Sequence, residues 1–183
     1  MKPDAIEIKI PEGLFIRPEL SNDYQSITEL NVKAFGQPGE AKLVEALRRN
    51  PQFIKGLSLV AVLDGKLLGH ILFFPIIIRN TDKVYRSLAL APMAVLPDYQ
   101  GRGIGSALVI AGIDEARAGK FGSVIVMGHR DYYPRFGFKK ASQYGIFPPF
   151  VVPDDVFFAL ELQPGALERV KGIVEYPLEF AEV

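Results

Sequence analysis

The sequence predicts a mixed α/β fold, in which a mostly antiparallel sheet carries helices on both faces. Two helical patterns come first, an antiparallel meander of strands follows, and a strand–helix–strand crossover comes next. A crossover of that kind joins two parallel strands, so the sheet is expected to be mixed. The length of 183 residues predicts a single domain over residues 1–183, because domains of about 150 residues are typical.

The first third of the chain is predicted to hold a strand and two helices. Apolar residues alternate with charged ones over residues 6–10, which predicts an opening strand. Ser21 is placed to cap a helix that runs to Phe35. The sequence Gly-Gln-Pro-Gly at residues 36–39 breaks this helix, and a second amphipathic helix is predicted over residues 40–49.

Three strands are predicted next. Residues 58–63 and 67–78 are apolar runs joined by an Asp-Gly pair, which is typical of two-residue hairpin turns. A third strand is predicted over residues 84–96. Pro92 lies inside this strand and lacks the N–H group that a ladder needs, so we expect the pairing to stop or bulge there.

The crossover is predicted from a helix over residues 104–118 and a strand over residues 123–127. Gly119 is placed to end the helix at the C′ position. The strand is almost entirely apolar, which is typical of a strand covered on both faces. One more strand is predicted over residues 156–162, and the pattern of the remaining residues places no further element.

The composition excludes several classes of function. The chain has 21 basic and 21 acidic residues, and a zero net charge argues against binding of nucleic acid or of an acidic membrane surface. The absence of cysteine excludes a thiol nucleophile and a thiolate metal site. With only two histidines, no histidine-rich metal site is expected either.

Two further features predict a cytoplasmic protein with no membrane association. The longest apolar run, residues 67–78, is shorter than the roughly 20 residues that cross a bilayer. Residues 1–13 alternate charged and apolar side chains, whereas a signal peptide has an apolar core of about 7–15 residues.

The strongest local signal is a glycine-rich turn between a predicted strand and the best predicted helix. It reads Gln-Gly-Arg-Gly-Ile-Gly-Ser over residues 100–106. Backbone N–H groups and the positive dipole end at the start of a helix favour a diphosphate, and glycines let it approach. A turn that serves only the fold is the alternative. The turn lacks the G-x-G-x-x-G spacing and following acid of a dinucleotide site, and the lysine of a nucleoside-triphosphate P-loop.

Two motifs resemble the GNAT family of acyl-CoA N-acyltransferases, and in particular its YhbS-like branch. Residues 100–105 match the signature Q/R-x-x-G-x-G/A, and residues 133–138, Tyr-Pro-Arg-Phe-Gly-Phe, resemble the family segment Y-x-x-x-G-F. Residues 68–71, 90–95, 158–162 and 164–167 carry the likeness to the YhbS-like branch and extend it to nearly the whole chain. The resemblance implies a GNAT-like fold with a splayed parallel strand pair, and acetyl-CoA (coenzyme A) as co-substrate without a metal.

The resemblance also implies roles for particular residues. Met93, Ala94 and Val95 would pair through backbone groups with the pantetheine arm and the thioester carbonyl. The pyrophosphate would be held by the turn and the helix start, which comprise Gly101, Arg102, Gly103, Ile104, Gly105 and Ser106. Tyr133 would protonate the departing thiolate, and the alternative for this residue is a tyrosine packed in the core.

The charge distribution agrees with a phosphate-bearing co-substrate. Residues 99–140 contain seven basic and three acidic side chains, a charge of +4 in a neutral chain. Phosphate groups are attracted to a surface of this sign, and an ordinary solvated surface is the alternative.

The sequence singles out no general base. Glu40 and His129 are candidates to contact the acceptor amine, and the alternative for Glu40 is a solvated acid that favours the helix dipole. His70 lies in an apolar strand and is more typical of a core histidine with satisfied hydrogen bonds. A water relay is the remaining alternative.

The predicted function is transfer of an acetyl group from acetyl-CoA to a primary amine. The acceptor is expected to be a small-molecule or peptide amine, and the protein a monomer or homodimer. One alternative is a non-catalytic acyl-CoA-binding sensor or interaction module, which would bind acyl-CoA without amine-dependent thiol release. An unrelated anion-binding α/β domain is the other, and it requires both motif matches to be accidental.

Overall fold

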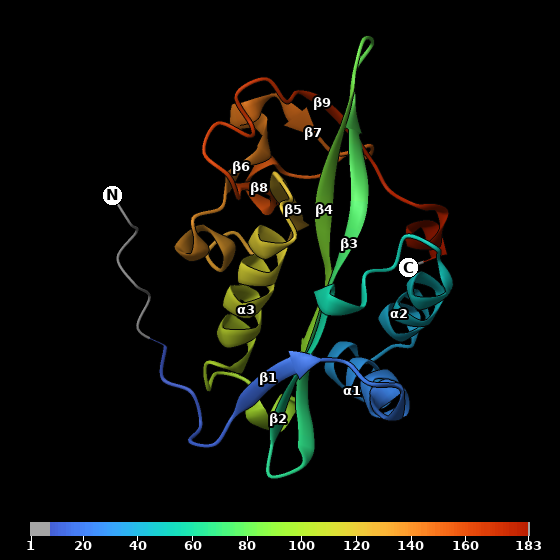
Figure 1. The fold of residues 1–183 in the computed structure, drawn as a ribbon, viewed down its shortest axis with the longest axis vertical. Helices are drawn as coiled ribbons and strands as arrows, with labels where there is room; N and C mark the ends of the chain where they lie inside the picture. The colour runs from blue at the N-terminus through green and yellow to red at the C-terminus, as the bar shows by residue number, and fades with distance from the viewer. Residues whose placement is uncertain (1–7, 183) are drawn as a thin grey trace. The chain divides into compact units, whose positions relative to one another are not determined.

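The computed structural model describes residues 8–182 of the chain (Figure 1). The helices in this range are α1 (Tyr24–Phe35), α2 (Gly39–Arg49) and α3 (Ile104–Ala118). The strands are β1 (Phe15–Pro18), β2 (Ser58–Leu63), β3 (Lys66–Arg79), β4 (Val84–Val95), β5 (Ser123–Met127), β6 (Lys139–Lys140), β7 (Ile146–Phe147), β8 (Phe157–Glu161) and β9 (Gly172–Glu175).

The sheet is mixed, as the sequence predicts. Its strand order is β1-β2-β3-β4-β5-β8-β6, with β9 paired to β3 and β7 paired to β9. The pairs β4–β5 and β7–β9 are parallel. The pairs β1–β2, β2–β3, β3–β9, β5–β8 and β6–β8 are antiparallel. The hairpin, the meander and the crossover therefore all occur in the predicted order.

The described residues form two compact units, each made of several chain segments. We call residues 8–74, 91–115 and 178–182 the loop unit, because they include the glycine-rich turn. We call residues 75–90 and 116–177 the tyrosine unit, because they include Tyr133. β3, β4 and α3 each contribute residues to both units.

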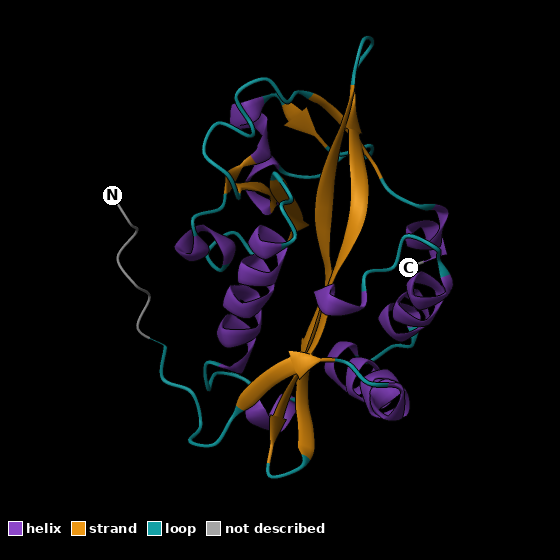
Figure 2. Ribbon diagram, in the orientation of Figure 1, coloured by secondary structure: helices purple, strands orange, loops and turns teal. Residues whose placement is uncertain are grey.

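In the loop unit, helices cover both faces of the β2–β3 hairpin (Figure 2). On one face, side chains of α1 and α2 form a core with those of the two strands; its members are Ile27, Leu43, Val44, Leu47, Val60, Val62, Leu72 and Phe74. On the other face, α3 packs closely on β3. A Cβ atom on Gly112 would overlap the Phe73 ring, and one on Gly69 would lie 2.8 Å from Leu108 Cδ1.

In the tyrosine unit, β5 lies between β4 and β8. It pairs with β4 at Leu88–Val124 and Ala89–Ile125, two positions that precede Pro92. Five of its residues pair with β8. The peptide bond between residues 91 and 92 is cis. The β4–β5 pairing is thus confined to positions before the proline, in agreement with the expected interruption.

The opening strand is predicted at the wrong place. Of residues 6–10, those from 8 onward have no strand conformation, and Ile6 lies outside the described residues. The first strand is β1, which pairs Phe15 with Val62 and Pro18 with Leu59. An alternating pattern shows that a segment can form a strand, but only a partner edge makes it one, and β1 pairs with β2 at that edge.

Two helix ends also differ from the prediction. Ser21 opens a 3-10 turn rather than capping α1, and the side chain that makes the hydrogen bonds is Asp23, which accepts from Leu20 N at 2.7 Å and from Arg17. At the end of α3 the left-handed residue is Lys120, with φ +59°, not Gly119. Bonds from Lys120 N to Arg117 O and from Phe121 N to Ala116 O complete a Schellman motif.

Three strands were not predicted: β6, β7 and β9. They are two to four residues long. β9 depends on a close backbone approach, because a Cβ atom on Gly172 would overlap the Arg79 carbonyl. Segments this short carry too few residues for a periodic pattern, and their pairing is decided by distant parts of the chain.

Candidate functional site

The candidate site begins where β4 ends. Ala94 and Val95 are buried, and Met93 is partly exposed. Directly after the strand, Leu96 N donates a 2.9 Å hydrogen bond to Leu68 O of β3. The backbone at the end of β4 is therefore held on β3 at the point where the chain leaves the sheet.

Gln100 joins the glycine-rich turn back to this strand end. A short 3-10 turn, Pro97–Tyr99, leads from β4 to Gln100. The Gln100 side chain then donates a 3.1 Å hydrogen bond from Nε2 to Val95 O. The first residue of the motif thus has a structural role, which the sequence analysis did not assign to it.

The turn itself requires glycine at two positions. Gly101 and Gly103 have φ of +74° and +78°, a conformation that other residues adopt only with strain. Gly103 is the N-cap of α3, because its carbonyl accepts the first helical hydrogen bond, from Ala107 N at 2.9 Å. The N–H groups of the first helical turn precede that bond, so helix geometry gives them no partner within the helix.

Two cations lie beside the turn. The Arg102 guanidinium lies 5.2 Å from the centroid of the Tyr99 ring, and the Lys66 ammonium lies 4.9 Å from it. Arg102 is a predicted site residue, whereas Lys66, from the start of β3, was missed. It is distant in sequence, and only the β2–β3 hairpin brings it to the turn.

The predicted catalytic residue, Tyr133, is buried in the tyrosine unit. It begins a 3-10 turn, Tyr133–Phe136, and packs against the rings of Tyr132, Phe138 and Phe158 at centroid distances of 5.1, 5.6 and 6.4 Å. Burial, with a smaller contribution from Tyr132, raises the pKa of Tyr133 above its ordinary value. No hydrogen bond joins its hydroxyl to another described residue. The phenol therefore stays protonated well above neutral pH.

Gly128 makes room for the Tyr133 ring. A Cβ atom at this position would overlap the Cε2 atom of the ring. The Gly128 backbone is itself held, since its N–H donates a 2.9 Å hydrogen bond to Val156 O. This glycine was not predicted as a site residue, and its only signal in the sequence is its place directly after a strand.

The two candidates for acceptor contact differ in exposure, because Glu40 is half-buried and His129 is not. Glu40 lies in the first turn of α2, in the loop unit, and both its carboxylate oxygens accept hydrogen bonds from Gln37 Nε2, at 3.1 and 3.2 Å. His129 is exposed and lies in the tyrosine unit, four positions before Tyr133.

His70 is a buried structural histidine, as the sequence favours. Its Nε2 atom lies 2.9 Å from Ser58 Oγ, and Ser58 donates to Glu19 Oε2 at 2.8 Å. Glu19 in turn accepts two hydrogen bonds from Arg48, at 2.8 and 3.0 Å. Burial and, second, the Arg48 charge lower the pKa of His70 to about 3. The imidazole is therefore neutral at working pH, and its 3.8 Å approach to Glu19 is not an ion pair.

The surplus of positive charge over residues 99–140 is partly compensated within the tyrosine unit. Arg130 pairs with Asp155 at 2.9 Å, and Lys140 pairs with Asp154 at 3.2 Å. Both carboxylates lie outside the counted segment. Counting charges along the sequence therefore overstates the positive charge that these residues present.

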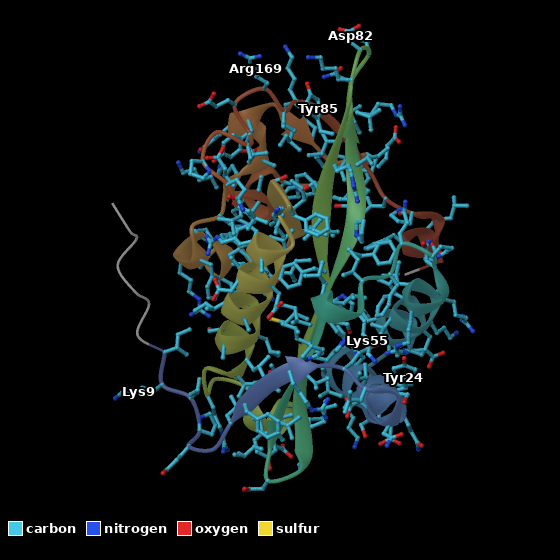
Figure 3. All side chains as sticks on the ribbon, viewed as in Figure 1. Lys9, Tyr24, Lys55, Asp82, Tyr85 and Arg169 are labelled. Atoms are coloured by element: carbon cyan, nitrogen blue, oxygen red, sulfur yellow. The ribbon has the colours of Figure 1, made fainter. Side chains whose placement is uncertain are left out.

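A pocket of about 420 Å³ lies elsewhere in the tyrosine unit (Figure 3). Its lining includes Asp82, Tyr85 and Arg169, which Figure 3 labels, and it includes none of the predicted site residues. Within residues 8–182, no group of three or more histidine or carboxylate side chains is arranged to hold a metal ion. No helix in the same range has the length and apolar character needed to cross a bilayer.

Comparison with known proteins identifies relatives of this chain. Residues 24–138 match the model of the acetyltransferase (GNAT) family. The chain is 38% identical over 135 residues to the uncharacterized N-acetyltransferase YjhQ of Escherichia coli K12. The aligned region covers 73% of this chain and 75% of YjhQ. It is 32% identical over 168 residues to the uncharacterized N-acetyltransferase YhbS of the same strain. Here the aligned region covers 91% of this chain and 98% of YhbS.

Solved structures agree with the sequence relatives. The crystal structure of E. coli YhbS in complex with CoA matches with a TM-score of 0.86 and 30% identity, over 96% of each chain. A GNAT family acetyltransferase from Brucella melitensis in complex with acetyl-CoA matches with a TM-score of 0.74 and 32% identity, over 91% of this chain and 97% of that one.

Proposed function

Because the chain belongs to the acetyltransferase (GNAT) family, we propose that it transfers an acetyl group from acetyl-CoA to a primary amine. The observation that carries the proposal is the glycine-rich turn, in which a short 3-10 turn after the strand end leads to two left-handed glycines and the start of a 15-residue helix. The YhbS and Brucella proteins described above were solved with CoA and acetyl-CoA.

The residues of the turn fit a phosphate-bearing co-substrate. Apart from Gly101 and its two chain neighbours, no heavy atom of the described residues lies within 4 Å of the place where a Cβ atom of Gly101 would be, so the turn leaves space at that position. The N–H groups and the dipole of the α3 start favour a diphosphate, as do the nearby cations Arg102 and Lys66. We propose that Gly101 to Ser106 hold the pyrophosphate.

The end of β4 is the proposed acyl-binding segment. Backbone groups of Met93, Ala94 and Val95 would bind the pantetheine arm and the thioester carbonyl. A backbone N–H group held rigidly at this strand end would stabilise the oxyanion that forms when the amine attacks. One such donor contributes about 10²–10³ in rate. The hydrogen bonds of Leu96 and Gln100 support this role, because they hold the strand end in place.

Tyr133 is the proposed general acid. When the amine nitrogen bonds to the carbonyl carbon, the C–S bond breaks and the thiolate takes up a proton, while the amine loses one. A phenol has an ordinary pKa of about 10, and burial raises that of Tyr133 further, so it enters the reaction protonated. The absence of a hydrogen bond to another described residue leaves the hydroxyl available to donate.

Three candidates remain for the base that receives the amine proton: Glu40, His129 and a water relay. The Glu40 side chain is partly exposed and that of His129 is exposed, so solvent reaches both. His70 is not a candidate, since it is buried and neutral. The acceptor we propose is a small-molecule or peptide amine.

Calorimetry with acetyl-CoA, NAD and ATP at equal concentrations tests the co-substrate first. We expect selective binding of acetyl-CoA, and release of free thiol that depends on an added amine. Absence of acetyl-CoA binding would remove the proposed function. Binding without amine-dependent thiol release, over a panel of small amines and peptides, would favour the non-catalytic acyl-CoA-binding module.

A further inference from the structure

The chain segment before β1 lies on the glycine-rich turn. A Cβ atom on Gly103 would overlap the Lys9 carbonyl oxygen and would lie 2.8 Å from Ile8 Cγ2. Ile8 and Lys9 therefore pack directly against the Cα atom of the α3 N-cap. All three residues belong to the loop unit.

The same segment is anchored at its other end. A 3.1 Å hydrogen bond from Leu14 N to Pro11 O closes a turn within the segment, and a Cβ atom on Gly13 would lie 3.6 Å from Leu63 Cδ1 of the β2–β3 hairpin. From Phe15 onward the chain is paired with β2. We call residues 8–14 the strap, because they connect β1 to the glycine-rich turn and are held at both ends.

The strap covers the turn without using its hydrogen-bond donors. Its contact is made with the Cα side of Gly103, and no backbone hydrogen bond among the described residues joins it to the N–H groups of the turn. The Lys9 side chain is exposed and points away from α3 (Figure 3). The strap is thus arranged as a wall beside the donors and does not block them.

We infer that Ile8 and Lys9 form a wall of the acetyl-CoA site, which raises its affinity for the co-substrate. The inference rests on the proposed function. A wall against the N-cap reduces the exposure of a bound diphosphate to water, and charge–dipole interactions strengthen as water is excluded. It also holds Gly103 in its left-handed conformation before the ligand arrives, which lowers the ordering needed on binding.

The first test compares the full chain with a variant that begins at residue 11. We expect the shortened protein to bind acetyl-CoA about tenfold more weakly by calorimetry, with an unchanged circular dichroism spectrum. Equal or tighter binding by the shortened protein would overturn the inference. Failure of the full chain to bind acetyl-CoA would instead overturn the proposed function on which the inference rests.

The second test uses two glycines with nearly the same backbone conformation. Gly101→Ala and Gly103→Ala introduce similar strain, but only the second pushes on the strap. In a double-mutant cycle, we expect part of the effect of Gly103→Ala on acetyl-CoA affinity to disappear in the shortened protein, and that of Gly101→Ala to be unchanged. Equal coupling energies between the shortening and each of the two glycine substitutions would contradict the inference that the strap forms a wall at Gly103. If the shortened protein does not fold, Ile8→Gly takes its place in the cycle.

Proteolysis checks the contact without any ligand. Lys9 is an exposed trypsin site within the strap. We expect Gly103→Ala to speed cleavage after Lys9 several-fold, because the strap is displaced, while Gly101→Ala leaves the rate unchanged. Equal cleavage of the two variants would show that the strap does not depend on Gly103.

Discussion

Two buried titratable side chains, His70 and Tyr133, contrast in what surrounds them. His70 lies among polar partners in the loop unit, where Ser58, Glu19 and Arg48 form a continuous hydrogen-bonded network. Tyr133 lies among aromatic rings in the tyrosine unit, and its hydroxyl is bonded to no other described residue. Burial favours the neutral form of both. The difference is that the ring nitrogen of His70 is engaged by polar side chains of the fold, whereas no described residue forms a hydrogen bond with the hydroxyl of Tyr133.

The largest expected effect is on the His70 network. Glu19→Gln removes the carboxylate that accepts from Arg48 and Ser58, and leaves a largely buried guanidinium without its counter-charge. We expect a loss of about 3–5 kcal/mol in the free energy of unfolding, measured by urea denaturation. A loss below about 1 kcal/mol would show that the network is not what stabilises this region. Arg48→Met in the Glu19→Gln background is the control, and it should recover part of the loss.

The pH dependence of stability gives the next effect. The pKa of His70 is lowered to about 3 in the folded protein from an ordinary value of 6.5. The unfolded chain therefore binds a proton between these values that the folded chain does not. The contribution of His70 is fully present above pH 6.5 and is lost as the pH falls towards 3, by up to about 1.4 kcal/mol per pH unit.

Denaturation curves between pH 7 and pH 4 for the native chain and for His70→Gln measure this contribution. The variant should be less stable at pH 7 and should show a shallower decline with falling pH. Parallel declines in the two proteins would mean that His70 binds its proton in both states.

For Tyr133, in contrast to His70, we expect substitution to change the turnover rate and not the free energy of unfolding. Tyr133→Phe keeps the ring contacts and removes the proposed acid. We expect turnover to fall by at least about tenfold, with the Kd for acetyl-CoA and the free energy of unfolding little changed. Tyr132→Phe is the matched control, because it removes a neighbouring hydroxyl from the same aromatic cluster. Unchanged turnover in Tyr133→Phe would show that Tyr133 is a packed core residue and not the general acid.

The smallest expected effect comes from an ion pair that is not buried. Arg130 and Asp155 lie 2.9 Å apart with side chains 64% and 34% exposed, whereas the Glu19 and Arg48 side chains are 1% and 11% exposed. We expect Arg130→Gln to change the free energy of unfolding by about 0–1 kcal/mol. A loss comparable to that of Glu19→Gln would show that burial does not explain the difference between the two pairs.

Much of the fold could be predicted because its signals are local. The Asp-Gly turn between β2 and β3, the apolar runs around it and the α3 pattern all lie within a few residues of the structure they specify. The predicted helix over residues 104–118 and the strand over residues 58–63 match the observed bounds. The elements that were missed, β1 and the short strands near the C-terminus, are defined by their partners.

The candidate site divides along the same line. Each of the motifs at residues 100–105 and 133–138 is a contiguous run, so the sequence by itself determined the glycine-rich turn, the tyrosine segment and, with them, the family. The contacts made by Lys66, Gly128 and the strap were not predictable from the sequence. Lys66 and the strap contact residues that are distant in the chain, and Gly128 comes to lie against the Tyr133 ring only in the folded protein.

Only the tertiary structure decided which polar groups find hydrogen-bond partners among the described residues and which do not. Gly101 and Gly103 read alike in sequence and have similar φ, yet one faces open space and the other faces the strap. His70 lies in an apolar run of sequence and Tyr133 follows a charged one, yet it is His70 that has polar partners in the fold and Tyr133 that packs among aromatic rings. Local sequence determines what the backbone can adopt, whereas long-range packing determines the neighbours of each side chain, and neighbours set hydrogen bonding, pKa and access.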